Sequence, residues 1–191
     1  ANTEQEPLEK HYVSSRSRSQ KGILVFLARD ATERVLCYAN AGVTKAEQAG
    51  ENLRFVNFWH QHTGSLPTEL VFDSQLTTYE HLNELNRKGI LFLTLRRRSR
   101  KMLGEIFSRP ASAWRRITLN SLTRTFRTPK VLDERIQLKG YDGYLRQVTV
   151  TDLGHEEPTI ILTNNFSIQC PALVTRYAQR MLIENGISEA I

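Results

Sequence analysis

The sequence predicts an α/β fold: a mixed sheet flanked by helices, with a β-rich insertion before the last helix. Three observations carry this prediction. Short apolar runs typical of strands alternate with longer segments of helical periodicity. The first two runs, 23–29 and 34–41, are separated by a short polar turn and predict a hairpin. Several β-like runs then lie between residue 96 and the last helix.

The N-terminal half can be divided element by element. Residues 1–21 are polar and predict an arm or linker. The run 23–29 is apolar throughout and predicts a strand buried on both faces, paired with 34–41. Thr44 begins a helical pattern that Gly64 ends.

The later elements follow the same alternation within one domain, at about 22–191, whose insertion is placed at about 96–156. A Gly-Tyr-Asp-Gly turn divides the insertion. The elements predicted after residue 64 are strands at 69–72 and 90–95, a helix capped by Thr77 or Thr78 that ends at Gly89, β-like runs at 115–119, 135–138 and 145–151, a strand at 158–163, and a helix at about 171–185.

Composition bounds the class of protein. Hydrophobic residues make up 40% and charged residues 24%, which is typical of a globular chain. The longest apolar stretch, 22–28, is far shorter than the roughly 20 residues of a membrane span. Cys37 and Cys170 lie far apart and form no Cys-x-x-Cys pair, which argues against structural zinc and favours a reducing compartment.

Positive charge is concentrated in one segment. The net charge is +6, yet residues 95–130 contain eleven Lys or Arg and one acid, a net charge of +10. Nine of the eleven are Arg, whose planar guanidinium suits phosphate. The segment therefore predicts a nucleic-acid partner, the alternative being a solvated surface without one. Trp114, inside it, is expected either to stack on a flipped base or to be a core residue.

Three acids stand where chemistry is expected. Asp30 follows the first strand and Asp73 the third, and ligands bind at strand ends in such sheets. Glu184 shares one face of the last helix with Tyr177 and Arg180, at spacings i, i+3 and i+7. Each has a plainer interpretation. Asp30 is also a common turn residue, Asp73 a cap, Glu184 a surface acid paired with Arg180, and Tyr177 a core residue.

Two segments resemble a known family. Residues 70–85, followed by Gly-Ile-Leu-Phe-Leu at 89–93, resemble the region around the second catalytic aspartate of DDE transposases from bacterial insertion sequences. Residues 177–184 are similar to their Tyr-Arg-Glu signature, which normally continues to a Lys where Ile191 stands here. The resemblance covers about residues 22–191, and we expect the chain to be truncated at both ends.

The resemblance implies an RNase H-like catalytic domain with a β-strand insertion. Its metal-binding and catalytic residues would be Asp30, Asp73 and Glu184, holding two Mg²⁺ ions for which Mn²⁺ may substitute. The activity implied is strand cleavage at transposon ends, followed by attack of the freed 3′-hydroxyl. The residues expected to bind DNA are Tyr177, Arg180, Arg96, Arg97, Arg98, Arg100 and Lys101.

The same resemblance implies double-stranded DNA as partner, a homodimer on paired ends, and the bacterial cytoplasm at the nucleoid as location. Two rival interpretations stay open. One is a non-catalytic DNA-binding remnant of a transposase. The other is a glycosidase that uses Asp73 and Glu184 as its two carboxylates, which would leave the basic segment without a purpose.

Overall fold

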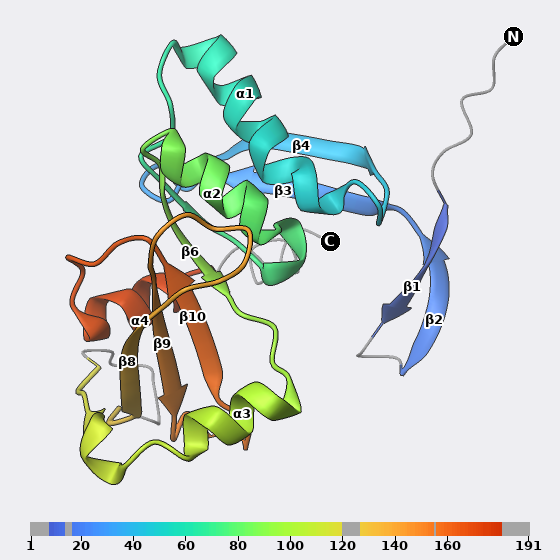
Figure 1. Ribbon diagram of the computed structural model, residues 1–191. Coiled ribbons are helices and arrows are strands. Elements are labelled where there is room, and N and C mark those ends of the chain that lie inside the picture. Colours follow the sequence, from blue (N-terminus) through green and yellow to red (C-terminus); the bar gives the residue numbers. More distant parts are fainter. Residues whose placement is uncertain (1–7, 14–16, 120–126, 155, 181–191) are drawn as a thin grey trace, which may run out of the picture.

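The computed structural model describes residues 8–13, 17–119, 127–154 and 156–180. Within these residues the chain forms a β1–β2 hairpin, a β3–β4 hairpin and a six-stranded mixed sheet (Figure 1). The elements are β1 (Glu9–Val13), β2 (Arg18–Gly22), β3 (Leu24–Arg29), β4 (Leu36–Val43), α1 (Glu51–Thr63), β5 (Glu69–Val71), α2 (Tyr79–Arg87), β6 (Leu91–Leu95), α3 (Arg100–Phe107), β7 (Trp114–Arg116), β8 (Lys130–Ile136), β9 (Leu145–Thr151), β10 (Thr159–Thr163) and α4 (Cys170–Ala178).

The large sheet has the strand order β5-β6-β10-β9-β8-β7. β5 and β6 are parallel and joined by α2, whereas every other neighbouring pair is antiparallel. The mixed α/β architecture predicted from the sequence is therefore confirmed. The alternation of side chains along a strand gives this sheet two apolar faces, and helices cover both.

One face of the sheet packs against α4. Leu173, Val174 and Tyr177 of α4 lie in one core cluster with strand residues such as Val148 and Ile161. The opposite face packs against α2 and α3, where Phe92 meets the leucines of α2 and Leu132 and Ile160 meet Met102 and Ile106 of α3. The strands are thus buried between two helical layers.

Local sequence explains where the helices begin and end. Thr78 caps α2 by accepting a hydrogen bond from the backbone N–H of His81 at 3.3 Å, as predicted. Ser99 caps α3 in the same way through Met102, also at 3.3 Å. Gly64 and Gly89 follow α1 and α2 with φ of 72° and 74°, a backbone conformation that favours glycine.

The predicted Gly-Tyr-Asp-Gly turn, residues 140–143, connects the insertion to α2 through hydrogen bonds and an ion pair. Asn83 donates to the Asp142 carboxylate at 2.9 Å and accepts from the Asp142 N–H at 3.0 Å. Arg87 pairs with the same carboxylate at 2.6 Å, and Tyr141 is buried beside α2. Burial raises the pKa of Tyr141 to about 12. Gly140 has φ of 90°, and a Cβ there would lie 2.4 Å from Glu80.

The structure corrects several predictions. Part of the expected arm at 1–21 forms the β1–β2 hairpin. The strand expected to be buried on both faces is not, because Val25 is 49% exposed and only one face of β3 meets α1. The helix expected from Thr44 begins at Glu51, after turns. The basic stretch, expected to contain strands and turns, also contains α3, and the predicted last helix is described only to Ala178.

Candidate functional site

Asp73 lies two residues after the end of β5 and is the N-cap of a short 3-10 helix, Ser74–Leu76. Its Oδ1 accepts hydrogen bonds from the backbone N–H of Gln75 at 3.0 Å and the Ser74 hydroxyl at 3.4 Å. Its Oδ2 lies 4.0 Å from a guanidinium nitrogen of Arg180, and the side chain is 39% exposed. Asp73 is therefore a cap through Oδ1, and its Oδ2 takes no part in the cap.

The end of α4 lies along β5 and connects the two segments that carry the family resemblance. Arg176 pairs with Glu69 at 2.8 Å, and Arg180, one helical turn later, approaches Asp73 at 4.0 Å. The sequence predicted both residues as functional but did not predict that Arg180 would face Asp73.

Tyr177 lies in the core rather than on the surface. It is 7% exposed, packs in the α4 cluster, and has a buried hydroxyl oxygen. The Arg180 guanidinium lies 5.6 Å from the centre of its ring, a cation–π contact. The geometry fits the core interpretation, with Tyr177 supporting Arg180, and differs from the expected direct contact of Tyr177 with DNA phosphate.

Asp30 lies in the β3–β4 turn. Its Oδ1 accepts hydrogen bonds from the N–H groups of Thr32 at 2.8 Å and Glu33 at 2.7 Å. We expected its strand to be part of the main sheet, but within the described residues β3 pairs with β4 alone. The turn interpretation thus accounts for Asp30, because its position is explained by the backbone bonds it accepts.

The metal-ligand set cannot be assembled from the described part of the chain. There, no group of three or more His, Cys, Asp or Glu side chains is arranged to hold a metal ion. The carboxylate of Asp73 carries oxygen atoms of the kind that Mg²⁺ prefers as ligands. Glu184 and Ile191 lie outside the described residues.

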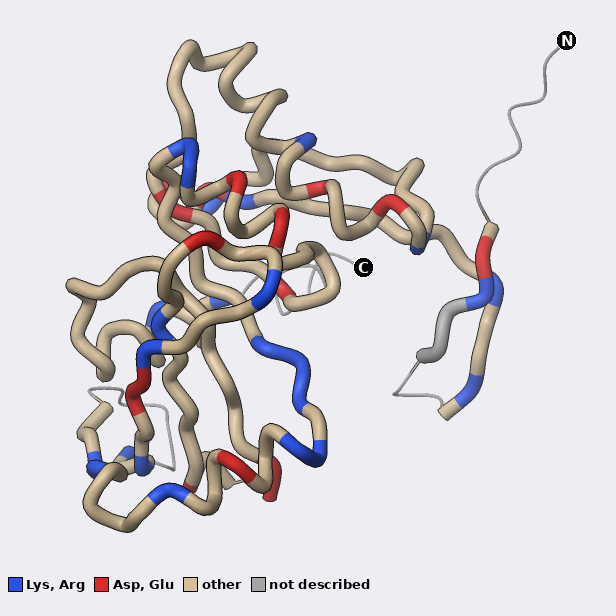
Figure 2. The backbone as a smooth tube through the Cα atoms, viewed as in Figure 1, with Lys and Arg blue, Asp and Glu red and all other residues tan. Residues whose placement is uncertain are grey.

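The basic run after β6 contains side chains that bond to other parts of the protein and side chains that do not bond to any described residue. Arg96 donates to Gln147 at 2.6 Å, and Arg98 pairs with Glu157 at 2.7 Å and donates to the Pro158 carbonyl. The other three predicted DNA-binding residues, Arg97, Arg100 and Lys101, are exposed and form no hydrogen bond or ion pair with any described residue. Figure 2 shows this run as a blue segment between β6 and α3.

The register of β5 and β6 relates Asp73 to this run. Val71 is opposite Leu93, and the Phe72 N–H donates to the Leu93 carbonyl at 3.1 Å, so the chain enters Asp73 beside the last residues of β6, just before Arg96. Parallel strands end at the same edge of a sheet, and β5 and β6 are neighbours. The carboxylate of Asp73 and the start of the basic run therefore lie side by side at the carboxyl ends of adjacent strands.

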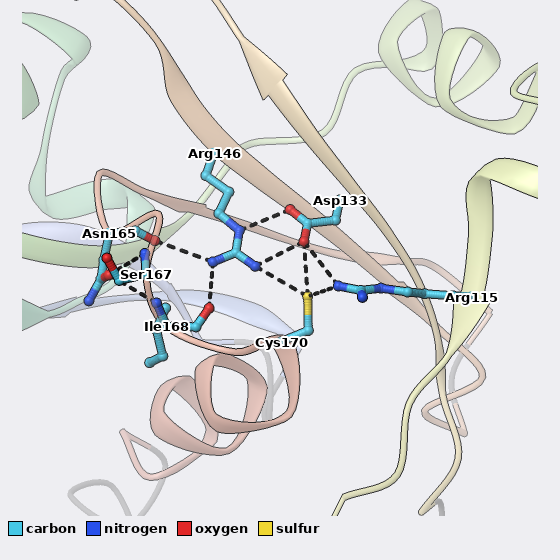
Figure 3. A network of polar contacts seen from close by, with 7 residues as sticks. All are labelled: Arg115, Asp133, Arg146, Asn165, Ser167, Ile168 and Cys170. Carbon is cyan, nitrogen blue, oxygen red and sulfur yellow. Dashed lines mark hydrogen bonds and ion pairs between the residues drawn. The ribbon is translucent and has the colours of Figure 1, made fainter.

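A polar network that the sequence analysis did not identify fixes the start of α4 (Figure 3). Arg146, 8% exposed, donates from Nε and a terminal nitrogen to the two oxygens of Asp133, each at 2.9 Å. It also donates to the Ile168 carbonyl at 2.6 Å. The Cys170 thiol donates to Asp133 at 3.1 Å, and Arg115 reaches both groups at 3.0 and 3.2 Å.

The electrostatics of the network favour an ionised Asp133 and a protonated Cys170. Burial alone would raise the pKa of Asp133, but the hydrogen bonds from Arg146 and Cys170 and the two positive charges outweigh it and lower the pKa. Burial and the adjacent carboxylate raise the pKa of the Cys170 thiol, so it is a structural donor rather than a nucleophile. The network joins β7, β8, β9 and the first residue of α4.

Comparison with known proteins does not assign the chain to a family. No protein-family model matches the sequence, and no curated protein matches it significantly. Among the described residues, no helix is both long and apolar enough to cross a bilayer.

Proposed function

We propose that this protein is a DDE-type DNA transposase with an RNase H-like catalytic domain and a β-strand insertion, acting in the transposition of an insertion sequence. The observation that carries the proposal is the approach of Arg180 to Asp73 at 4.0 Å. It brings together the two segments that resemble the family, although they lie more than one hundred residues apart in the sequence.

The surroundings of Asp73 support a role in DNA chemistry. The carboxylate is at the end of a strand whose parallel neighbour leads directly into Arg97, Arg100 and Lys101. These three free cations would bind the phosphate backbone without reading sequence. Arg180, already beside the carboxylate, would orient either Asp73 or a phosphate oxygen of the scissile bond.

In this proposal Asp73 and Glu184 hold Mg²⁺ or Mn²⁺, and the resemblance names Asp30 as the third ligand. The metal would supply an activated water or 3′-hydroxyl and stabilise the leaving oxygen. The Asp73 side chain fits this role, because one oxygen is fixed by the Ser74–Leu76 turn and the other is free of hydrogen bonds from that turn. The use of Asp30 in its own turn makes it the ligand most in need of a test.

The test is a titration of Mn²⁺ or Mg²⁺ into the purified chain, followed by calorimetry and by nicking of supercoiled plasmid DNA. The variants are Asp73→Asn, Asp30→Asn and, as a matched control in the same turn as Asp30, Glu33→Gln. We expect metal binding and metal-dependent nicking by the parent and Glu33→Gln, and neither by Asp73→Asn. Loss with Asp30→Asn as well would assign Asp30 to the metal site together with Asp73, and loss with Glu184→Gln would assign the third carboxylate.

Three results would change the proposal. If Asp30→Asn binds metal as the parent does, Asp30 is a turn residue alone and the third ligand lies elsewhere. If metal binds but DNA stays intact, the site stands without the strand-transfer activity in this chain. If the parent chain binds no metal but still binds plasmid DNA, the protein is better interpreted as a non-catalytic DNA-binding remnant than as an enzyme.

A further inference from the structure

The β1–β2 hairpin extends away from the rest of the molecule (Figure 1). Among the side chains that the structure describes, none of this hairpin belongs to a hydrophobic core cluster. A two-stranded hairpin without such packing is marginally stable in water. The hairpin is attached to the body at its base, where the Glu9 carboxylate accepts a hydrogen bond from the Lys45 N–H at 2.8 Å and the Lys45 ammonium donates to the Lys10 carbonyl.

Two lysines lie directly opposite each other on this hairpin. The register pairs Lys10 of β1 with Lys21 of β2, so their side chains lie on the same face. Both residues are exposed, and neither side chain forms a hydrogen bond or ion pair with any described residue. Like charges directly opposite each other destabilise a strand pair. The two lysines therefore oppose formation of the hairpin unless a negative group lies beside them.

The acids nearest to the two lysines in the described part of the chain have other partners. Glu9 precedes Lys10, so the alternation of side chains places it on the opposite face, where it accepts the bond from Lys45. The Glu47 carboxylate accepts a hydrogen bond from the Thr44 hydroxyl at 2.7 Å. Lys45 adds a third positive charge beside β1. This balance of charge fits a partner that carries several negative charges.

We propose that the face of the β1–β2 hairpin that carries Lys10 and Lys21 binds the phosphate backbone of double-stranded DNA. Opposite residues of an antiparallel pair have Cα atoms about 4.5–5.5 Å apart, so their long side chains can reach neighbouring phosphates. A two-stranded ribbon is also narrow enough to enter the major groove. A bound phosphate would offset the repulsion between the lysines, so DNA binding would stabilise the hairpin.

The inference rests on the proposed function, because it takes DNA as the partner. It adds a contact surface on an element other than those that carry Asp73 and the basic run after β6. The contact requires neither a metal ion nor cleavage, so it can be measured when the catalytic chemistry is switched off.

The test measures the anisotropy of a fluorescein-labelled DNA duplex, titrated with the wild-type chain in EDTA at salt concentrations from about 50 to 200 mM. Each phosphate contact contributes about 0.9 to the slope of log affinity against log salt concentration. The double variant Lys10→Ala and Lys21→Ala should therefore reduce this slope by about 2 and weaken binding roughly ten-fold at low salt. The matched control, Lys88→Ala with Lys139→Ala, removes two other exposed charges and should bind as the wild type does.

A second variant separates DNA binding from folding of the hairpin. Lys10→Glu places opposite charges across the strand pair, which favours the hairpin, yet it should weaken DNA binding about as much as the double alanine variant. Contact is measured directly by acetylation and mass spectrometry. Bound duplex should slow the acetylation of Lys10 and Lys21 and leave that of Lys139 unchanged.

An unchanged salt slope in the double alanine variant, wild-type affinity in Lys10→Glu, or equal acetylation with and without DNA would each overturn the inference. Asp73→Asn should bind the duplex in EDTA as the wild type does. Loss of the catalytic site with the lysine effect intact would therefore contradict the proposed function alone, and the reverse result would contradict the hairpin contact alone. A wild-type chain that does not bind the duplex would overturn both.

Discussion

The Asp133–Arg146 pair gives the sharpest stability prediction. In Asp133→Ala the guanidinium of Arg146, 8% exposed, loses two charge-assisted hydrogen bonds of 2.9 Å. Removing one partner of a fully buried pair costs about 3–5 kcal/mol. The Asp133 side chain is 25% exposed and Arg146 keeps the Ile168 carbonyl, so we expect a smaller loss of about 2–3 kcal/mol in the free energy of unfolding.

Urea denaturation followed by circular dichroism measures this loss. For a chain of this size it corresponds to a fall in Tm of about 5–10 °C. Asp152→Asn is the matched control, since it removes one carboxylate whose partner Arg116 is 56% exposed, and should cost less than about 1 kcal/mol. If the two variants lose the same stability, the network contributes nothing beyond an ordinary surface pair.

The same variant has a defined pH dependence. The pKa of Asp133 is lowered in the folded protein, so its contribution is present above the unfolded value of about 3.9 and is lost as pH falls through the folded value. The stability difference between wild type and Asp133→Ala should therefore be full at neutral pH and shrink below about pH 4. A difference that stays constant down to pH 2 would refute the assignment of the lowered pKa to this pair.

Three further predictions concern other parts of the molecule. Gly140→Ala should lower the free energy of unfolding by about 1–2 kcal/mol in a urea titration, because φ at this residue is 90° and the new Cβ would meet the Glu80 side chain. The control Gly104→Ala, in α3, should not lower the free energy of unfolding, since nothing lies within 4 Å of the new Cβ. Neutralising Arg97, Arg100 and Lys101 together should weaken the binding of plasmid DNA and reduce the slope of log affinity against log salt concentration by about 3. An unchanged slope would argue against contact of these residues with the DNA backbone. Tyr141 should titrate near pH 12 by ultraviolet absorbance, with that titration missing in Tyr141→Phe; ionisation near 10 would mean that the ring is not buried.

The mixed α/β class and several element boundaries could be predicted because their signals are local. Thr78 and Gly89 mark the ends of α2, and the run 145–151 forms β9 at the predicted boundaries. α3 was missed since it begins inside the basic run at Arg100 and Lys101, and that run was interpreted by its charge. The pairing of whole strands was harder, because a strand's sequence does not state which neighbour it joins.

The candidate site could be predicted only in part. Asp73 and Arg180 were identified from their motifs, and the structure brings them together. Asp30 was ambiguous, because an aspartate after a strand has the same local sequence whether it caps a turn or faces a ligand. The Asp133–Arg146–Cys170 network could not be foreseen, since its members come from three elements and become partners only when the sheet and α4 are packed.

The position of Arg180 couples two binding equilibria: that of a cation at the Asp73 carboxylate and that of an anion at the Arg180 guanidinium. A cation that binds the Asp73 carboxylate competes with the guanidinium 4.0 Å away for the same negative charge. By reciprocity, whatever draws Arg180 toward another anion, such as a phosphate, frees Asp73 and raises its affinity for the cation by the same factor. In the proposed function DNA and metal would therefore bind cooperatively, and the Arg176–Glu69 pair, one turn away, would keep the helix attached to β5 while Arg180 changes partner.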